Sequence, residues 1–370
     1  MSNSLSKATK AIEVIRPDVR AMHAYHVQDA AGFIKLDAME NPFTLPAELQ
    51  VELGQRLGAV ALNRYPGTRI NDLHAALHRH AQVPDGYSIV LGNGSDELIS
   101  LLSLACAQPG ATVLAPLPGF VMYEMSAKLQ GLNFVGVPLT ADFELDTAAM
   151  VAAVRQHRPA ITYIAYPNNP TANLWDDDAI QAIVDAVAQE GCGFVVMDEA
   201  YQPFASQSYL GRLPKSPHVL LMRTLSKFGL AGVRLGYLIG PQALVAEFDK
   251  ARPPYNVSVL NAEAALFALE HEAEFTRQAQ VIKAERERVQ AALATMPGVK
   301  SYPSQANMIL VRVPDAAAVF TGLKERGILI KNVAGMHGLL AHCVRLTVGL
   351  PSENDALIAA LQSTLNSIPT

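Results

Sequence analysis

The sequence predicts an α/β protein with a large domain, built on a mostly parallel doubly wound sheet, and a smaller α/β domain at the C-terminal end. Two observations favour this fold class. Short apolar segments alternate with amphipathic helical patterns along most of the chain, and the pattern changes after Pro253 and Pro254. A length of 370 residues suits two domains of about 100–200 residues each. Half of the residues are apolar and 17% are charged, an ordinary balance for a protein with a large core.

The strands of the large domain are predicted from short apolar segments bounded by turn residues. Several are apolar throughout, as parallel strands covered by helices on both faces are. Between them, aliphatic residues from Ile180 to Val187 recur at helical spacing behind an acidic start, which predicts a helix over 179–189. The predicted strands cover residues 88–91, 112–115, 133–137, 161–165, 193–197, 219–222 and 235–239.

A long helical pattern over 259–296, charged in its second half, opens the C-terminal part. Strands are predicted at 308–313, 328–331 and 344–348, with helices over 315–326 and from residue 354. We expect residues 51–255 to form the large domain, and residues 256–370 the connecting helix and the small domain. Residues 1–50 contain no complete strand–helix unit, so this segment is expected to pack on the small domain.

Composition and charge exclude several classes of function. The net charge is −5 and no basic patch is present, so neither nucleic acid nor an anionic membrane is an expected partner. The apolar runs are far shorter than the roughly 18 residues of a membrane span, and the N-terminus lacks a secretory h-region. Three widely separated cysteines predict no disulfide framework. With no disulfide framework and no secretory h-region, the protein is expected to be cytoplasmic. The run His74, His78, His80 fits an exposed helix face better than a metal site, so we expect no bound metal.

Lys227 is the strongest candidate for chemistry. It follows a predicted buried strand in the segment Thr224-Leu225-Ser226-Lys227, and α/β folds bind ligands at the carboxyl ends of their strands. Burial there lowers the pKa of a lysine, and the neutral amine can form a Schiff base. Ser226 and Arg234 beside it suit a phosphate. Taken alone, the motif also fits a surface lysine in a loop.

Three other strand ends carry complementary groups. Asp198 can pair with a pyridine nitrogen, although an aspartate in this position is also a common helix cap. Asn169 can donate an amide hydrogen bond to a phenolate oxygen. The amides of Ser95 and Asp96 open a helix, where an anion binds. A phosphate cradle, an amide donor, a carboxylate and a lysine together predict pyridoxal 5′-phosphate as the cofactor.

On these motifs the chain resembles the fold type I pyridoxal-phosphate aminotransferases, and within them the histidinol-phosphate aminotransferases, over nearly its whole length. The resemblance implies transamination between L-histidinol phosphate and 2-oxoglutarate, giving imidazole acetol phosphate and glutamate in histidine biosynthesis. It also implies a homodimer. The segments that carry it are 36–42, 63–67, 94–97, 167–171, 198–201, 226–227 and 344–349.

The same resemblance implies the role of each site residue. Lys227 forms the Schiff base and moves the substrate's proton, Asp198 pairs with the pyridine nitrogen, and Tyr201 with Asn169 holds the phenolate oxygen. Phe120 stacks on the pyridine ring. The implied phosphate ligands are Ser95, Asp96, Thr224, Ser226 and Arg234, joined by Tyr65 from the partner subunit. The implied substrate residues are Tyr25, Asn41, Lys331 and Arg345.

Other functions share parts of this pattern. An aromatic amino-acid aminotransferase, or a pyridoxal-phosphate-dependent decarboxylase of a phosphorylated amino acid, would use much the same site. A cofactor-binding regulator would need a DNA-binding module, and the segment before Leu36 is short and carries no helix-turn-helix pattern. The order of preference is therefore the histidinol-phosphate enzyme, then the other two enzymes, then the regulator.

Overall fold

The computed structural model describes residues 10–22, 24 and 28–368. The chain forms two compact units, Met1–Gly32 and Phe33–Thr370. In the first unit, α2 (Pro17–Arg20) is a short helix, and Nε of Arg16 donates a hydrogen bond to Oδ1 of Asp18 at 3.1 Å. The second unit carries the sheets described below. None of the described helices has the length and apolar character that a membrane span requires.

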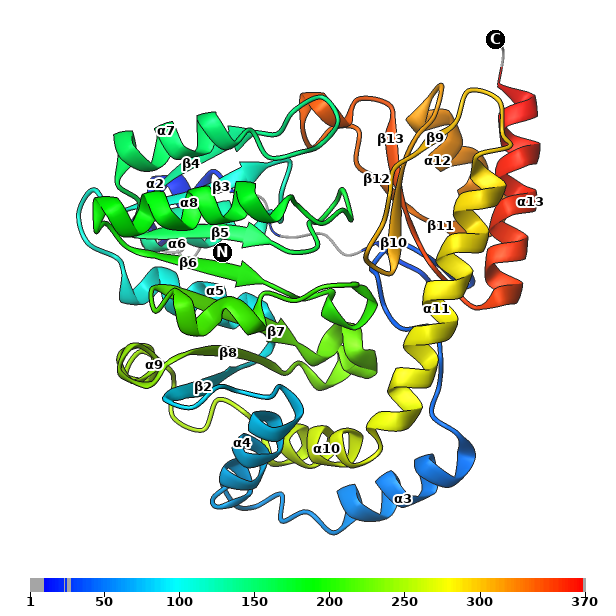
Figure 1. Ribbon diagram of the computed structural model, residues 1–370. Helices are drawn as coiled ribbons and strands as arrows, with labels where there is room; N and C mark the ends of the chain where they lie inside the picture. Colours follow the sequence, from blue (N-terminus) through cyan, green and yellow to red (C-terminus); the bar gives the residue numbers. More distant parts are fainter. Residues whose placement is uncertain (1–9, 23, 25–27, 369–370) are drawn as a thin grey trace. The chain divides into compact units, whose positions relative to one another are not determined.

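A seven-stranded sheet in the order β2-β8-β7-β6-β5-β3-β4 forms the large domain (Figure 1). Strands β3 to β7 are parallel, whereas β8 is antiparallel to both β7 and β2. The predicted mostly parallel sheet is thus confirmed. Its strands are β2 (Tyr87–Gly92), β3 (Thr112–Leu117), β4 (Asn133–Pro138), β5 (Ile161–Ala165), β6 (Phe194–Asp198), β7 (Val219–Thr224) and β8 (Gly236–Pro241).

Helices cover both faces of this sheet, which explains why its strands are apolar throughout. In β6, Val195 and Met197 pack into one hydrophobic core while Phe194 and Val196 pack into another, because successive side chains point to opposite faces. The helices of this domain are α3 (Ala47–Gly58), α4 (Arg69–His80), α5 (Gly94–Ala105), α6 (Met122–Gln130), α7 (Thr147–His157), α8 (Asp177–Glu190) and α9 (Gln242–Asp249).

The small domain contains an antiparallel sheet in the order β12-β13-β10-β9. Its strands are β9 (Lys300–Ser301), β10 (Met308–Arg312), β12 (Lys331–Asn332) and β13 (Cys343–Thr347). Its own hydrophobic core includes residues of α11 (Glu272–Leu293), α12 (Ala316–Glu325) and α13 (Pro351–Ser367). A separate parallel pair joins β1 (Ile34–Lys35) to β11 (Ile328–Leu329), so the predicted strand at 328–331 is divided between two sheets.

The prediction of one helix over 259–296 is wrong. The pattern forms two helices, α10 (Val259–Glu270) and α11, which are separated at His271. Ala265 and Leu266 of α10 pack into a core of the large sheet, while Ile282 and Val289 of α11 pack into the small-domain core. The two segments bury apolar side chains against different cores, so the chain changes direction between them (Figure 1).

Candidate active site

The carboxyl ends of β5, β6 and β7 and the start of α5 line a pocket. Because these three strands are parallel, the residues at their ends meet at one edge of the sheet, and in Figure 1 the arrowheads of β5 and β6 point toward the small sheet. The structure brings ten of the predicted cofactor residues together here: Ser95, Asp96, Phe120, Asn169, Asp198, Tyr201, Thr224, Ser226, Lys227 and Arg234.

Lys227 lies in a π-helical turn (Ser226–Leu230) directly after β7. Its Nζ donates a hydrogen bond to the carbonyl oxygen of Ala38 at 3.1 Å and lies 5.7 Å from the ring centre of Tyr201. Burial, aided by the positive charge of Arg345, lowers the pKa of Lys227 to about 8. A large share of this amine is therefore neutral at mildly alkaline pH, and the neutral form is the one that adds to a carbonyl carbon.

Asp198, the last residue of β6, is held by two donors. Oδ2 accepts a hydrogen bond from the hydroxyl of Tyr123 at 2.6 Å, and Oδ1 accepts one from the backbone N–H of Ala200 at 3.0 Å. Burial raises the pKa of Asp198 to about 6, against the opposing effect of these two hydrogen bonds. A buried, oriented carboxyl group of this kind is suited to pair with a cationic ring nitrogen.

Glu199, the next residue, is buried but does not line the pocket. Its Oε2 accepts hydrogen bonds from Nε and Nη2 of Arg223 at 3.0 and 2.8 Å, and the hydroxyl of Ser208 donates to its Oε1 at 2.9 Å. Successive residues at a strand end face opposite ways. The pair between Glu199 and Arg223 therefore ties β6 to β7 behind the pocket, next to the residues that face into it.

A chain of hydrogen bonds links the pocket to the small sheet. Nδ2 of Asn169 donates to the hydroxyl of Tyr201 at 3.1 Å, and Nη1 of Arg345 donates to Oδ1 of Asn169 at 2.7 Å. Arg345 lies on β13, is 7% exposed, and also donates to the carbonyl oxygen of Asp37 at 2.9 Å. Burial raises the pKa of Tyr201, so its phenol stays neutral and can donate its proton to an anionic oxygen.

The other end of the pocket is built to hold an anion. Gly94 adopts a φ of +78°, a left-handed conformation that favours glycine, and a Cβ at this position would lie 2.8 Å from Nη2 of Arg234. Arg234 donates from Nη1 to the hydroxyl of Ser226 at 3.4 Å and from Nη2 to Oδ2 of Asp96 at 3.1 Å. The first amides of α5 have no partner within the helix, which makes this end attractive to a phosphate. The carboxylate of Asp96 is already hydrogen-bonded to Arg234, so a bound anion would accept a hydrogen bond from the backbone N–H of Asp96.

These residues fit pyridoxal 5′-phosphate. A cationic cradle at the start of α5 suits the phosphate, and the buried Asp198 suits the pyridine nitrogen. Asn169 and Tyr201 supply neutral donors for the phenolate oxygen, and Lys227 supplies an amine of lowered pKa for the aldehyde.

The structure places the remaining predicted residues elsewhere. Asn41 does not line the pocket, and its Nδ2 donates to Oε1 of Gln278 at 2.8 Å. Lys331 is the direct neighbour of Arg345 between β12 and β13, so the two side chains share one face of the small sheet. Tyr65 is 74% exposed, lies outside this pocket and stacks on Tyr255 with ring centres 4.3 Å apart. Tyr25 lies outside the described residues.

The histidine run lies on a helix, α4, as predicted, but the expected exposed face is only partly present, because His78 is exposed while His74 and His80 are half-buried. Nδ1 of His80 is 3.1 Å from Oε1 of Glu272, and burial lowers the pKa of His74. Across the described residues there is no cluster of three or more His, Cys, Asp or Glu side chains that could hold a metal ion.

Tyr123 and Met39 also line the pocket, although the sequence did not predict them as site residues. Tyr123 orients Asp198 and stacks on Tyr163, and its position three residues after Phe120 is a signal that both line one side of the site. Met39 lines the pocket with a φ of 52°, a left-handed conformation that is rare for methionine. Its N–H donates to the hydroxyl of Thr347 at 3.1 Å, and its carbonyl oxygen accepts from Nδ2 of Asn307 at 3.0 Å. Nothing in the local sequence predicts this conformation.

The fold and the strand-end lysine define an aminotransferase of class I and II, and the model of that family, "Aminotransferase class I and II", matches residues 31–361. A histidinol-phosphate aminotransferase of Methylibium petroleiphilum is 71% identical over 359 residues, which cover 97% of this chain and 96% of the relative. Another, of Polaromonas naphthalenivorans, is 65% identical over 356 residues, 96% of this chain and 97% of the relative. The chain belongs to the histidinol-phosphate aminotransferase family.

Solved structures agree with this assignment. The histidinol-phosphate aminotransferase of Sinorhizobium meliloti, in complex with pyridoxal-5′-phosphate, aligns with a TM-score of 0.85 at 26% identity and covers 98% of this chain and 100% of its own. L-threonine-O-3-phosphate decarboxylase of Porphyromonas gingivalis aligns with a TM-score of 0.74 at 22% identity, over 90% of this chain and 99% of its own. At that identity the decarboxylase shares the fold alone. The predicted fold class, family and enzyme class are confirmed.

Proposed function

We propose that this protein transfers an amino group between L-histidinol phosphate and 2-oxoglutarate, giving imidazole acetol phosphate and glutamate, with pyridoxal 5′-phosphate as cofactor. The observation that carries the substrate is 71% identity with a histidinol-phosphate aminotransferase over 97% of the chain. The pocket supplies the chemistry. Aromatic aminotransferase and decarboxylase activities are the alternatives, and the relatives named above do not favour them. A biosynthetic activity of this kind suits the cytoplasm.

The bound cofactor supplies an electron-withdrawing ring that accepts the electrons of the substrate's Cα–H bond. Lys227 Nζ would hold the cofactor's aldehyde and, once the substrate's amine has displaced it, would be free to take the proton from Cα, a task for which its pKa of about 8 is suited. Asp198 would keep the ring nitrogen protonated. Tyr201 and Asn169 would donate hydrogen bonds to the phenolate oxygen, and Phe120 would pack against the ring. The proposed phosphate ligands are Ser95, Asp96, Thr224, Ser226 and Arg234.

Arg345 and Lys331 supply the charge for substrate. The enzyme must accept glutamate, which has an α-carboxylate, and then histidinol phosphate, which has a phosphate ester instead. A planar guanidinium matches either anion, and Arg345 is already fixed in the site through Asn169. Lys331 beside it adds a second positive charge for the phosphate. Tyr25 and Asn41 complete the proposed substrate set on the family resemblance alone.

Charge removal tests this substrate assignment. A lost charge-assisted hydrogen bond costs roughly 1.5–3 kcal/mol, or about 10- to 150-fold in kcat/KM. We expect Arg345→Ala to impair both half-reactions by about this factor, and Lys331→Ala to impair histidinol phosphate more than glutamate. Lys324→Ala, an exposed lysine on α12, is the control that should change neither.

The decisive measurement is kcat/KM for histidinol phosphate, histidinol, phenylalanine and tyrosine under one condition. The kcat/KM for histidinol phosphate should be far higher than that for histidinol, because removing the phosphate takes away the anion that Arg345 and Lys331 would bind. Equal rates for phenylalanine or tyrosine would replace the proposal with an aromatic aminotransferase. Release of carbon dioxide from a phosphorylated amino acid without amino transfer would replace it with the decarboxylase.

We also propose a homodimer in which Tyr65 reaches the phosphate cradle of the partner subunit. Support comes from large apolar side chains that are exposed on α3, on the loop after it and around the start of α10. Monomers rarely expose such a set, whereas subunit interfaces bury it. The exposed fractions are 62% for Val51, 69% for Leu62, 74% for Tyr65, 57% for Tyr255 and 40% for Leu260.

Subunit mixing tests the dimer. Tyr65→Ala and Lys227→Ala should each be nearly inactive, but a mixed dimer would contain one site with both native residues. Random exchange at equal amounts should therefore restore about a quarter of the wild-type activity. Exchange can be followed by mass spectrometry of the intact dimers. If exchange occurs without recovery, Tyr65 does not act across the interface.

For the domains, we propose the division expected from the sequence, at residues 1–50, 51–255 and 256–370, with α10 at the start of the last segment packed on the large domain. Within the unit that begins at Phe33, the parallel pairing of β1 with β11 supports contact between residues 33–50 and the small domain.

A further inference from the structure

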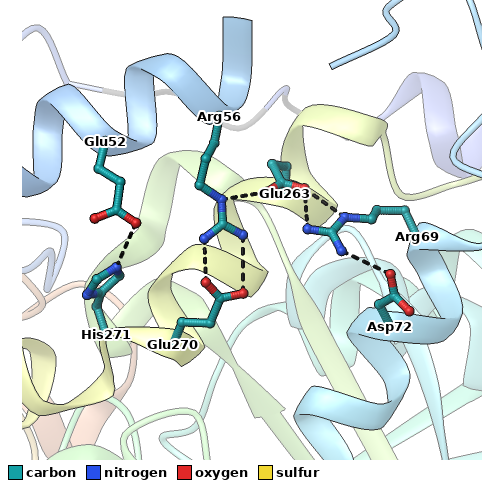
Figure 2. Close-up of polar contacts among 7 residues, drawn as sticks. All are labelled: Glu52, Arg56, Arg69, Asp72, Glu263, Glu270 and His271. Carbon is teal, nitrogen blue, oxygen red and sulfur yellow. Dashed lines mark hydrogen bonds and ion pairs between the residues drawn. The ribbon is translucent and has the colours of Figure 1, made fainter. Parts of the chain in front are cut away.

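One buried carboxylate fixes both ends of the loop that carries Tyr65. The loop covers residues 59–68, between α3 and α4. Arg56, in the last turn of α3, donates from Nε to Oε1 of Glu263 at 2.7 Å, and Arg69, the first residue of α4, donates from Nε to Oε2 at 2.8 Å. Figure 2 shows Glu263 of α10 between the two guanidinium groups.

Glu263 is the shared and the most buried member of this cluster. Its side chain is 9% exposed, and its neighbours along α10 are buried alanine and leucine residues. A buried carboxylate is retained only when it is paired, and here each oxygen faces a different arginine. Two further carboxylates bind the outer sides of the arginines: Glu270 pairs with Arg56, and Asp72 pairs with Arg69 at 2.9 Å. Their side chains are 54% and 55% exposed.

The loop has few other anchors. Pro66 is its one buried residue and Val60 is half-buried. Leu62 is exposed, and Tyr65 is exposed on one side while its ring stacks on Tyr255. Backbone hydrogen bonds in this loop close local turns, such as the one from Arg64 N–H to the carbonyl oxygen of Ala61 at 3.1 Å. The position of the loop on the large domain is therefore set where its two ends meet Glu263 and where Tyr65 stacks on Tyr255.

We propose that Glu263 is a positioning residue for the cofactor site of the partner subunit. By holding Arg56 and Arg69 together it fixes the span of the loop, and so the place of the Tyr65 hydroxyl at the partner's phosphate cradle. The inference rests on the proposed dimer and on the proposed contact of Tyr65 with the cofactor phosphate. Glu263 does not line the pocket, so its effect falls on cofactor affinity and not on proton transfer at Lys227.

Cofactor affinity of matched charge variants tests this role. Glu263→Gln keeps the shape of the side chain but removes the charge shared by the two arginines. Glu270→Gln removes an equal charge from an exposed neighbour and leaves the bridge intact. Titration of each apoenzyme with pyridoxal 5′-phosphate, followed by protein fluorescence, should show a Kd about tenfold higher for Glu263→Gln and within about twofold of wild type for Glu270→Gln. At saturating cofactor, kcat should stay within about twofold of wild type for both.

A double-variant cycle with Tyr65→Phe shows whether the effect passes through Tyr65. If it does, adding Glu263→Gln to Tyr65→Phe should change the Kd little further, whereas independent effects would multiply. Multiplied effects, or an unchanged Kd in Glu263→Gln, would overturn the inference while leaving the proposed role of Tyr65 standing. An unchanged Kd in Tyr65→Phe alone would remove that role, and the inference with it. Should Glu263→Gln fail to fold, as thermal melting of the apoenzyme would show, Glu263→Asp keeps the charge on a shorter side chain and should give an intermediate Kd.

Discussion

Lys227→Ala is expected to lower kcat for transamination by at least about 10²–10⁴-fold, the range that a positioned general acid–base supplies. The loss arises because no other described amine lines the pocket, so no side chain there can both hold the aldehyde and move the proton at Cα. The measurement is single-turnover kinetics with glutamate. In wild-type protein, reduction with borohydride and peptide mapping should place the cofactor on the peptide that contains Lys227.

Two observations would contradict this assignment. One is a reduced adduct on another lysine, and the other is a Lys227→Ala variant that retains turnover. Lys215→Ala is the matched control, because Lys215 is exposed on the segment that connects β6 to β7 and does not line the pocket. It should match wild type in both assays.

The pH dependence of cofactor attachment follows from the pKa of Lys227. In the apoenzyme this pKa is lowered to about 8 by burial and by Arg345. The neutral amine therefore increases about tenfold per pH unit below pH 8, and the rate of attachment should rise likewise and level off above it. The same pKa affects the stability of the apoenzyme. Below about pH 8 burial of the charged lysine lowers the free energy of unfolding. This loss is recovered as pH rises from about 8 to the ordinary lysine pKa of 10.5, because the folded state then holds the neutral amine.

The parts of the site that follow from strand ends could be predicted from the sequence. Lys227, Asp198 and Asn169 each come directly after an apolar run, and parallel strands bring such positions to one edge. At these positions the local sequence pattern and the sheet topology agree, so the order of strands and polar residues along the chain predicts the site.

The parts that depend on distant contacts could not be predicted. Met39 takes a left-handed conformation because Thr347 and Asn307, far along the chain, bind its N–H and carbonyl oxygen. The break at His271 depends on which core each half of the helical pattern meets. In the sequence, Glu263 is a polar residue among apolar neighbours, with nothing to indicate its partners. The two arginines lie about 200 residues earlier, so only the folded chain shows their connection.

Asp198→Ala is expected to bind the cofactor more weakly but still to hold some of it through the phosphate cradle, and at saturating cofactor to lose about 10²–10³-fold in kcat, as the removal of one preorganised electrostatic partner does. Without the carboxylate the ring nitrogen is not kept protonated, and the ring accepts electrons less well. Measuring kcat and the cofactor Kd separately distinguishes this outcome from simple loss of cofactor. A kcat within about threefold of wild type would show that the ring nitrogen needs no carboxylate.

Tyr123→Phe is the graded companion to Asp198→Ala, because it removes one hydrogen bond and leaves the carboxyl group in place. That hydrogen bond favours the charged carboxylate, so its loss should raise the pKa of Asp198 above its value of about 6. Since the carboxylate is the form that pairs with a cationic ring nitrogen, wild-type apoenzyme should bind cofactor more weakly as pH falls through about 6, and Tyr123→Phe should lose affinity at a higher pH. Affinity measured from pH 5 to 8 checks this shift. An unchanged profile in Tyr123→Phe would mean that Asp198 does not control the affinity, and a profile that vanishes in Asp198→Ala would identify this carboxyl group as its source.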